Sequence, residues 1–272
     1  TVAGHAVVRE TLVHRREPRI EFRVTTDWRG DDGFLTFEWP EVPGGRIVGD
    51  IPFGVEEKNL AAEPYGADTP SRVWDNIERQ REGLFYARSF VSSSDGRAGC
   101  SFIGGDGTRY YRKTGSTLAA VLLNTVTHRP GWERFLNESP AAVGRHRFTV
   151  HLVFHRGDWR TANVPARAAA MLTPVENLPA GVAGAARKPG LPPAHSFISL
   201  SPAGLLMTSC RAVGGWLEIR FYETLGRRTE AVLTLERPVR AVEKVALSGK
   251  ALARPRPGRS VRLPVRPWEI VT

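Results

Sequence analysis

Residues 146–155 alternate in polarity with a period of two, and this run constrains the fold more than any other part of the sequence. Phe148, Val150 and Leu152 fall on one side of an extended chain, and polar residues dominate the other side. Successive side chains of a β-strand point to opposite faces, so the run predicts a strand that ends in a turn at residues 156–159. Such a strand needs a sheet to join.

Similar runs, separated by Gly, Pro, Asn and Asp, occupy most of the chain, as is typical of β proteins. Asp32-Gly33 is a strong hairpin signal, so Phe34–Trp39 is predicted to pair with the strand before it. The predicted strands are Val7–Val13, Arg19–Trp28, Phe34–Trp39, Ile47–Asp50, Ile51–Glu57, Leu84–Val91, Gly99–Ile103, Leu118–Leu123, His146–His155, Thr161–Met171, Phe197–Leu200, Leu205–Cys210, Trp216–Tyr222, Glu230–Leu235, Ala241–Leu247, Val261–Leu263 and Glu269–Val271.

Two other segments organise the chain. Ser71–Glu82 begins with a capping residue and has helical spacing, so it is the one predicted helix. Pro174–Pro193 is rich in Pro, Gly and Ala, lacks periodicity and predicts a linker. The sequence therefore predicts an all-β protein with one domain over residues 1–195 and a small β-sandwich over residues 196–272.

The charge of the chain does not favour nucleic-acid binding. The net charge is +10, and Lys58, Lys113, Lys188, Lys244 and Lys250 are the only lysines, so arginine supplies most of it. These arginines are spread along the chain, whereas a nucleic-acid site needs a concentrated basic patch.

Hydrophobicity and cysteine content indicate where in the cell the chain is found. No apolar run approaches the roughly 20 residues that span a bilayer, and no signal-peptide pattern opens the chain, so we expect no membrane association. Cys100 and Cys210 are too few for a disulfide framework and predict two buried thiols in a reducing, cytoplasmic setting. The chain begins at Thr1 and not at Met, which is consistent with a piece of a longer polypeptide.

Three of the seven histidines, His146, His151 and His155, lie in the opening run. On a helix, His151 and His155 would share a face at a usable zinc spacing. On a strand, four residues cover about 13 Å, too far for two ligands of one ion. We therefore predict no metal site within this chain, unless groups from outside complete one.

Nucleophilic and acid–base chemistry finds little support. No Gly-x-Ser-x-Gly turn is present, and neither cysteine has an activating neighbour in the sequence. A carboxylate pair of the kind that hydrolyses glycosides remains open, because such pairs come from distant positions. The candidates, each also explained as a solvent-facing residue, are Glu21, Asp27, Glu56, Glu57, Asp158 and Glu223.

Several stretches, taken in order, resemble the C-terminal β-domains of glycoside hydrolase family 38, the α-mannosidases, especially bacterial members. The stretches are Pro18–Arg23 with Asp27-Trp28, Asp50–Glu57, Gly144–Phe148 with Gly157–Trp159, Arg220–Gly226, and Val261–Pro264 with Pro267–Val271. No single motif decides the matter, but together they cover almost the whole chain.

The resemblance implies a galactose-mutarotase-like supersandwich over residues 1–195, followed by the small β-sandwich. It also implies that the catalytic residues and a divalent metal, zinc, belong to an N-terminal catalytic domain absent from this chain. The chain would pack on that domain of the same polypeptide, complete the rim of its cleft for a mannose-containing glycan, and be inactive alone. The rim or interface candidates are His146, His151, Asp158, Trp159, Tyr222 and Glu223.

The chain departs from the family pattern at two places. Relatives have Asp-x-Gly-x-His where this chain has Ala142 before Gly144 and His146, and Leu-Leu-Arg where it has Asn124 after Leu123. Both changes weaken any claim that this chain completes an active α-mannosidase site.

Two other classes of function stay open. A freestanding carbohydrate-binding module would use exposed aromatic residues such as Tyr110, Trp132 or Trp159 to stack on sugars. Nucleic-acid binding is the less favoured alternative.

Overall fold

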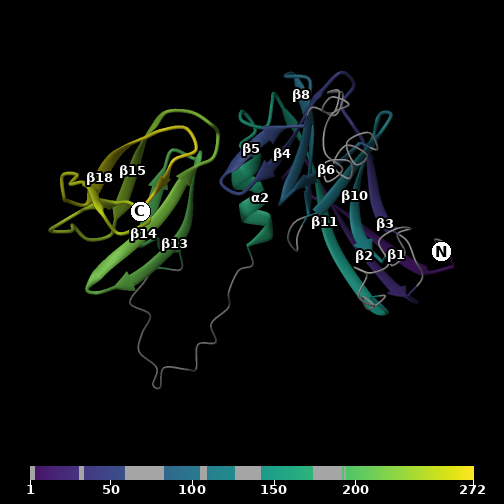
Figure 1. Ribbon diagram of the computed structural model, residues 1–272, viewed down its shortest axis with the longest axis horizontal. Coiled ribbons are helices and arrows are strands. Elements are labelled where there is room, and N and C mark those ends of the chain that lie inside the picture. The colour runs from purple at the N-terminus through teal and green to yellow at the C-terminus, as the bar shows by residue number, and fades with distance from the viewer. Residues whose placement is uncertain are drawn as a thin grey trace, which may run out of the picture. The chain divides into compact units, whose positions relative to one another are not determined.

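The computed structural model describes residues 4–30, 34–58, 83–104, 109–125, 142–173, 192 and 194–272 (Figure 1). The chain divides into two compact units, Thr1–Pro52 with Glu56–Val164, and Phe53–Val55 with Pro165–Thr272. The described residues form β-sheets and one short helix, which confirms the all-β prediction. The boundary predicted after residue 195 stays a prediction, and the segment 174–191 before it lies outside the described residues.

The larger sheet has seven strands and centres on the run of alternating residues. That run forms β11, which pairs antiparallel with β2 on one side and β8 on the other. The strands, in spatial order, are β1 (Ala6–Val13), β2 (Arg19–Trp28), β11 (Gly144–Arg156), β8 (Ala98–Gly104), β7 (Phe90–Ser94), β4 (Arg46–Ile51) and β5 (Gly54–Glu57).

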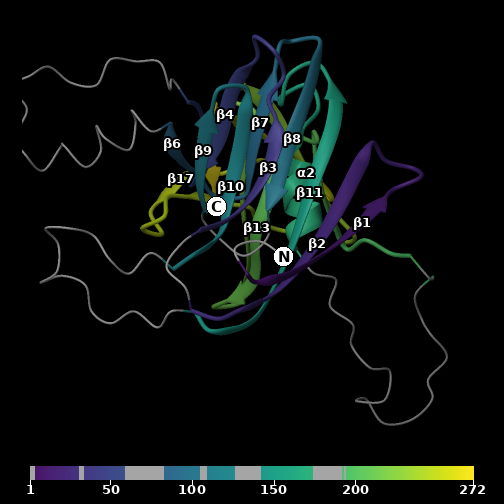
Figure 2. The same ribbon diagram turned by 90° about the vertical axis from the view of Figure 1, so that its right-hand side faces the viewer.

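A four-stranded sheet belongs to the same unit (Figure 2). Its strands, in spatial order, are β3 (Phe34–Pro40), β10 (Thr117–Asn124), β9 (Arg109–Thr114) and β6 (Leu84–Ala87). One apolar core joins the two sheets, because Val150 and Leu152 of β11 belong to the same buried cluster as Trp39 of β3 and Leu118 of β10. The apolar side of β11 therefore faces the interior of a two-sheet sandwich.

The predicted hairpin between β2 and β3 is wrong. β2 pairs with β1 and β11, whereas β3 pairs with β10 in the other sheet. The rings of Phe22 and Phe37 meet across the core with centroids 4.9 Å apart. Alternation thus identified the buried side of each strand correctly, but it does not specify the neighbouring strand.

The predicted single strand Leu84–Val91 is also wrong, because the structure has two strands there. β6 joins the four-stranded sheet and β7 joins the seven-stranded sheet. Between them the chain changes sheets, and the buried carboxylate of Asp50 accepts hydrogen bonds from the backbone N–H groups of Arg88 (3.0 Å), Ser89 (2.7 Å) and Phe90 (2.9 Å). The Asp50 carboxylate thus binds backbone N–H groups that, in a continuous strand, would have bonded to a neighbouring strand.

The segment predicted as the strand Thr161–Met171 instead contains a helix, α2 (Val164–Leu172). Alanines 166 and 168–170 have the highest helix propensity of any residue, and Pro165 suits a first helical turn. Val164 and Ala168, one turn apart, are both buried. The helix predicted at Ser71–Glu82 lies outside the described residues, as do the turn at Asp32-Gly33 and Trp132.

The second unit contains a small β-sandwich (Figure 1). One sheet has the order β12 (Ile198–Ser201), β15 (Thr229–Leu235), β18 (Ser260–Val265), and the other has the order β13 (Leu205–Val213), β14 (Trp216–Glu223), β19 (Ile270–Val271). A separate pair is β16 (Lys244–Val245) and β17 (Ala251–Ala253). Phe221 of β14, Leu233 of β15 and Val261 of β18 lie in one buried cluster, so the sandwich has its own core.

Within the described ranges, no helix is long and apolar enough to cross a membrane.

Candidate functional site

His146 stabilises the start of β11. Its Nε2 donates a hydrogen bond to the backbone carbonyl of Ala142 at 2.6 Å, and its ring stacks with Phe148 at a centroid distance of 6.2 Å. Ala142 has a φ of 47°, in the left-handed region that is uncommon for alanine. The histidine therefore supports a bend at the position where the family pattern has its acidic residue.

His151 and His155 lie on the side of β11 that faces away from the apolar core, and they have different neighbours. His155 Nε2 is 2.9 Å from Ser101 Oγ, which in turn donates to Ser92 Oγ. A Cβ at Gly99 would lie 2.1 Å from His155 Cε1, so only glycine fits beneath this ring. Within the described residues, no group of three or more His, Cys, Asp or Glu side chains could hold a metal ion.

A charged cluster surrounds Glu21 on the same side of the sheet. The Glu21 carboxylate accepts from Arg23 Nε at 2.8 Å and from His14 Nε2 at 3.2 Å. Arg19 donates to His14 Nδ1 at 2.8 Å, and since arginine has no acceptor, His14 must carry its proton on Nε2. The sequence offered Glu21 as a candidate acid but gave no sign of a role for His14, Arg19 or Arg23.

His151 is the buried member of this cluster. Its residue is 5% exposed, and its Nδ1 is 4.0 Å from Glu21 Oε2 without a hydrogen-bond partner among the described residues. Burial, helped by the charge of Arg19, lowers the pKa of His151, although Glu21 acts in the opposite direction. Burial raises the pKa of the Glu21 carboxyl, but hydrogen bonds from Arg23 and His14 outweigh it and leave that pKa below its ordinary value. We name His14, Arg19, Glu21, Arg23 and His151 the Glu21 cluster.

Asp158 and Trp159 organise the turn that leads to α2. Asp158 Oδ1 accepts from both the backbone N–H and the Oγ1 of Thr161, each at 2.8 Å. Trp159 is 3% exposed, and the guanidinium of Arg160 lies 4.2 Å from the centre of its ring. The expectation that Trp159 is an exposed platform for sugar stacking is therefore wrong. Tyr110 lies in β9, but its side chain is outside the described part of the structure.

Glu223 joins two of the stretches that resemble the family. Its buried carboxylate accepts from the backbone N–H groups of Leu225 (2.8 Å), Arg227 (3.1 Å) and Trp268 (3.1 Å). The Arg220–Gly226 stretch and the Pro267–Val271 stretch thus meet at one side chain. Tyr222, beside it on β14, pairs in register with Leu206 and Ile270.

Five other acidic or thiol groups predicted from the sequence have simple surroundings. Glu56 pairs with Lys58, Glu57 lies 3.7 Å from Arg46, and Asp27 is exposed opposite Arg145 in the sheet. Cys100 is buried, which raises its thiol pKa to about 11. Cys210 is exposed, so the prediction of two buried thiols is correct for Cys100 and wrong for Cys210.

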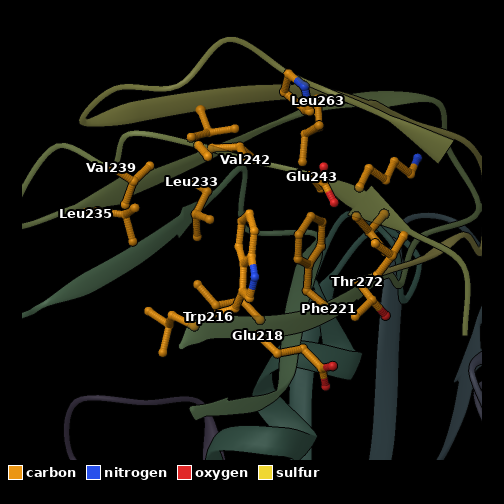
Figure 3. Close-up of a pocket in the computed structure, with 18 of the residues that line it drawn as sticks. Trp216, Glu218, Phe221, Leu233, Leu235, Val239, Val242, Glu243, Leu263 and Thr272 are labelled. Carbon is orange, nitrogen blue, oxygen red and sulfur yellow. The ribbon is translucent and has the colours of Figure 1, made fainter. Parts of the chain in front are cut away.

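The small sandwich contains a cavity of about 300 Å³ between its two sheets (Figure 3). Leu233, Leu235 and Leu263 supply apolar side chains on one side, and Trp216 and Phe221 of β14 reach into it from another. Nothing in the sequence pattern distinguished these positions from ordinary core residues.

Taken together, the sheets and these clusters define an all-β protein whose candidate residues mostly hold the chain in place. Residues 214–272 match the family profile described as the glycosyl hydrolases family 38 C-terminal beta sandwich domain. Among curated protein sequences, none matches the chain.

Two solved structures have a similar fold. An alpha-mannosidase from Enterococcus faecalis V583 superposes with a TM-score of 0.74 at 16% identity, over 97% of this chain and 28% of that one. A glycosyl hydrolase family 38 protein from Enterococcus faecalis gives a TM-score of 0.72 at 16% identity, over 97% of this chain and 29% of that one. The predicted resemblance is confirmed by the family profile at residues 214–272 and by the fold over nearly the whole chain. This chain spans less than a third of either solved protein.

Proposed function

We propose that this chain is the C-terminal β-domain region of a family 38, α-mannosidase-like glycoside hydrolase and has no glycosidase activity by itself. One observation carries the proposal: the fold matches over 97% of this chain but only 28% of the Enterococcus faecalis alpha-mannosidase. Most of such an enzyme would therefore lie outside these residues. The family profile at residues 214–272 supports the same assignment.

The first unit is, in this proposal, a galactose-mutarotase-like supersandwich. Its support is the pairing of a seven-stranded with a four-stranded sheet around one core. The large sheets are a platform for a catalytic domain of the same polypeptide, and the glycan would bind in that domain.

The six candidate residues differ in how well they suit a rim or interface. His146 and Asp158 hold backbone groups of their own segments, and Glu223 holds those of its own and of a distant segment, which assigns all three structural roles. His151 is buried in the Glu21 cluster, which also gives it a role within the sheet, although its Nδ1 has no hydrogen-bond partner among the described residues.

The zinc ion that the resemblance implies does not suit the residues described here. His151 and His155 have separate partners, and no described cluster has enough ligands for a metal. We therefore assign no metal-dependent step to this chain, and the ion would belong to the catalytic domain.

The proposal is tested by comparing residues 1–272 with the longer polypeptide encoded by the same open reading frame. We expect the longer protein to hydrolyse aryl α-mannosides and residues 1–272 to show no turnover. Full activity of residues 1–272 would refute the proposal. In the longer protein, His151→Leu should weaken activity by loosening the domain, and Asp27→Asn on the same sheet is a matched surface control.

The alternative of a carbohydrate-binding module has less support, because Trp159 is buried. Calorimetric titration of residues 1–272 with mannose oligosaccharides tests it directly. Saturable heat at millimolar sugar would favour the module. Binding to nucleic acid that weakens steeply with salt would favour the remaining alternative.

A further inference from the structure

The small sandwich carries a two-branched ribbon that follows β15 and leads back to β18 (Figure 1). A backbone hydrogen bond from Val239 N–H to the Gly258 carbonyl, at 3.1 Å, joins the two branches. Further along, β16 pairs antiparallel with β17. The ribbon ends in a turn, in which Ala246 N–H donates to the Lys250 carbonyl at 2.8 Å. We name residues 236–259 the basic ribbon.

The net charge of the chain is concentrated in the basic ribbon. The ribbon contains seven basic residues but only two acidic ones, so it supplies half of the net charge of +10. Arginines occur along the whole chain, whereas acidic residues are scarce in this segment. The excess of positive charge therefore gathers at one place, although the arginines themselves are spread out.

Most of these cations have no acidic partner within the described residues. Arg254 is paired with Glu243 at 3.1 Å. Lys244 is paired with Glu269 at 2.7 Å. Arg259 Nε donates to a neutral backbone carbonyl at 3.3 Å. The others are exposed and form no ion pair with a described residue: Arg237, Arg240, Lys250 and Arg256.

The rest of the second unit has no acidic group left to neutralise them. Residues 174–191, which lie outside the described part, contain one acidic residue, Glu176, against Arg187 and Lys188. An anion that pairs with the ribbon therefore comes from outside this unit. The remaining acidic residues of the unit already have partners: Glu218, Glu223, Glu230, Glu236, Glu243 and Glu269.

Two apolar side chains at the end of the ribbon indicate the kind of anion. Leu247 lies in the turn and is 68% exposed, and Leu252 of β17 is 59% exposed. Among the large apolar side chains described in the small sandwich, these two are the most exposed. They do not belong to the inner side of the ribbon, where Val239 and Val242 pack against the core (Figure 3). The end of the ribbon thus presents apolar and basic side chains together to solvent.

This combination suits an anionic lipid surface better than a soluble polyanion. Anionic lipids attract clustered basic residues, and apolar side chains can enter the interfacial region of the same bilayer. A nucleic acid or an anionic polysaccharide would pair with the arginines but would leave both leucines in water. The ribbon also contains no aromatic residue on which a base could stack. The leucines therefore decide between these ligands.

We propose that the basic ribbon binds the surface of an anionic membrane, with Leu247 and Leu252 in the interfacial region and the unpaired arginines at lipid phosphate groups. Guanidinium groups suit phosphate because they donate two parallel hydrogen bonds to it. The expectation of no membrane association rested on the lack of a spanning segment and of a signal peptide, and binding at the surface needs neither. This binding is separate from the proposed glycosidase role and does not depend on it.

Co-sedimentation of residues 1–272 with lipid vesicles tests the proposal. At about 0.1 M salt, we expect half-maximal binding at roughly 0.3 mM lipid for vesicles of equal parts phosphatidylglycerol and phosphatidylcholine. Vesicles of phosphatidylcholine alone should bind about tenfold more weakly or less, because they lack the net negative charge. Raising the salt to about 0.5 M should also weaken binding, because it shortens the Debye length.

Arginine substitutions test whether the binding site is local. Arg240→Gln combined with Arg256→Gln should weaken vesicle binding by about thirtyfold. Arg227→Gln combined with Arg228→Gln is the matched control, since both arginines are exposed and precede β15, whereas the ribbon follows it. This control removes the same net charge away from the ribbon, so its loss should be about threefold or less.

Leucine substitutions distinguish a membrane from other polyanions. Leu247→Ser combined with Leu252→Ser should weaken vesicle binding about tenfold, because two apolar side chains no longer leave water. Binding of inorganic polyphosphate should stay unchanged in this variant. Val13→Ser combined with Val213→Ser is the control, because both valines are exposed and lie outside the ribbon.

Equal binding to both kinds of vesicle, or to neither, would overturn the proposal. An equal loss in the two arginine variants would also overturn it, because net charge alone would then explain the binding. Vesicle binding that is unchanged by the leucine substitutions would mean that the ribbon takes polyanions in general and not a membrane. None of these results depends on mannoside hydrolysis, so the proposed function is tested separately.

Discussion

Single buried carboxylates hold several of the segments that the sequence marked as candidates. The carboxylates of Glu223 and Asp50 each accept hydrogen bonds from three backbone N–H groups, which lie in turns or in segments distant in the sequence. A buried carboxylate in such a setting has its acceptor oxygens hydrogen-bonded, which explains its presence without catalysis.

Replacing Glu223 tests this structural role. Glu223→Ala leaves three N–H groups without their acceptor, so we expect the free energy of unfolding of the second unit to fall by about 3 kcal/mol. The exposed ion pair of Glu230 with Arg262 is the control, and Glu230→Ala should cost about 0.5 kcal/mol. Urea unfolding followed by circular dichroism measures both. Equal losses in the two variants would contradict the structural role.

The Glu21 cluster should make stability sensitive to acid. The pKa of His151 is lowered in the folded chain from an ordinary 6.5, so below pH 6.5 the unfolded chain takes up a proton that the folded chain resists. Stability is therefore complete above pH 6.5 and falls as the pH drops toward the lowered value. The lowered pKa of Glu21 adds a further loss only in stronger acid.

Replacing His151 should make the stability of the chain less dependent on pH. In His151→Leu, we expect the unfolding midpoint to change less between about pH 7 and about pH 5.5 than in the parent, while the steeper fall in stronger acid remains. Urea midpoints at a series of pH values provide the measurement. An unchanged slope in the variant would show that His151 titrates alike in both states.

At the scale of elements, the chain crosses between sheets at places that its polarity pattern does not mark. β6 and β7 are separated by two residues, yet they belong to different sheets. β2 and β3 also belong to different sheets, and the rings of Phe22 and Phe37 meet across the core between them. Alternation reports which side of a strand is buried, and both members of each pair bury a side against the same core.

The β6–β7 crossing depends on Asp50. Asp50→Ala should lower the unfolding free energy of the first unit by about 3 kcal/mol, because the backbone N–H groups of Ser89 and Phe90 lose their acceptor, whereas that of Arg88 keeps the backbone carbonyl of residue 50. Asp95→Ala is the control, since Asp95 accepts two backbone N–H groups in an exposed turn that water can also satisfy, and its loss should be smaller. Thermal unfolding monitored by near-ultraviolet circular dichroism distinguishes the two. A smaller loss in Asp50→Ala than in Asp95→Ala would argue against the crossing as the critical point.

At the scale of the whole molecule, the described residues contain two separate apolar cores. Phe102 is fully buried in the core of the two large sheets, and Phe221 is buried in the core of the small sandwich. Each core lies within its own unit, so each unit can respond to a substitution separately.

This separation predicts two unfolding transitions in residues 1–272. Phe102→Ala should lower one midpoint and Phe221→Ala the other, each through a loss of about 3 to 5 kcal/mol in its own unit. Differential scanning calorimetry of the parent and both variants provides the measurement. A single transition that both variants shift equally would mean that the units unfold together.

The sequence by itself determined the secondary structure class and the orientation of β11. Alternation in residues 146–155 requires an extended chain with one apolar side, so the separation of His151 from His155 follows from backbone geometry alone. It also determined that motifs near Arg220 and Pro267 resemble one family, which the profile at residues 214–272 confirmed.

Only the tertiary structure decided which strands are neighbours and which polar groups meet. The carboxylate of Glu223 reaches Trp268 across 45 positions, and Asp50 reaches Phe90 across 40. Such contacts depend on how the strands are ordered in the sheets. The local pattern of polar and apolar residues does not specify that order. The same reason hid the meeting of Glu21 with His151, because these residues lie on two strands whose pairing the sequence pattern does not specify.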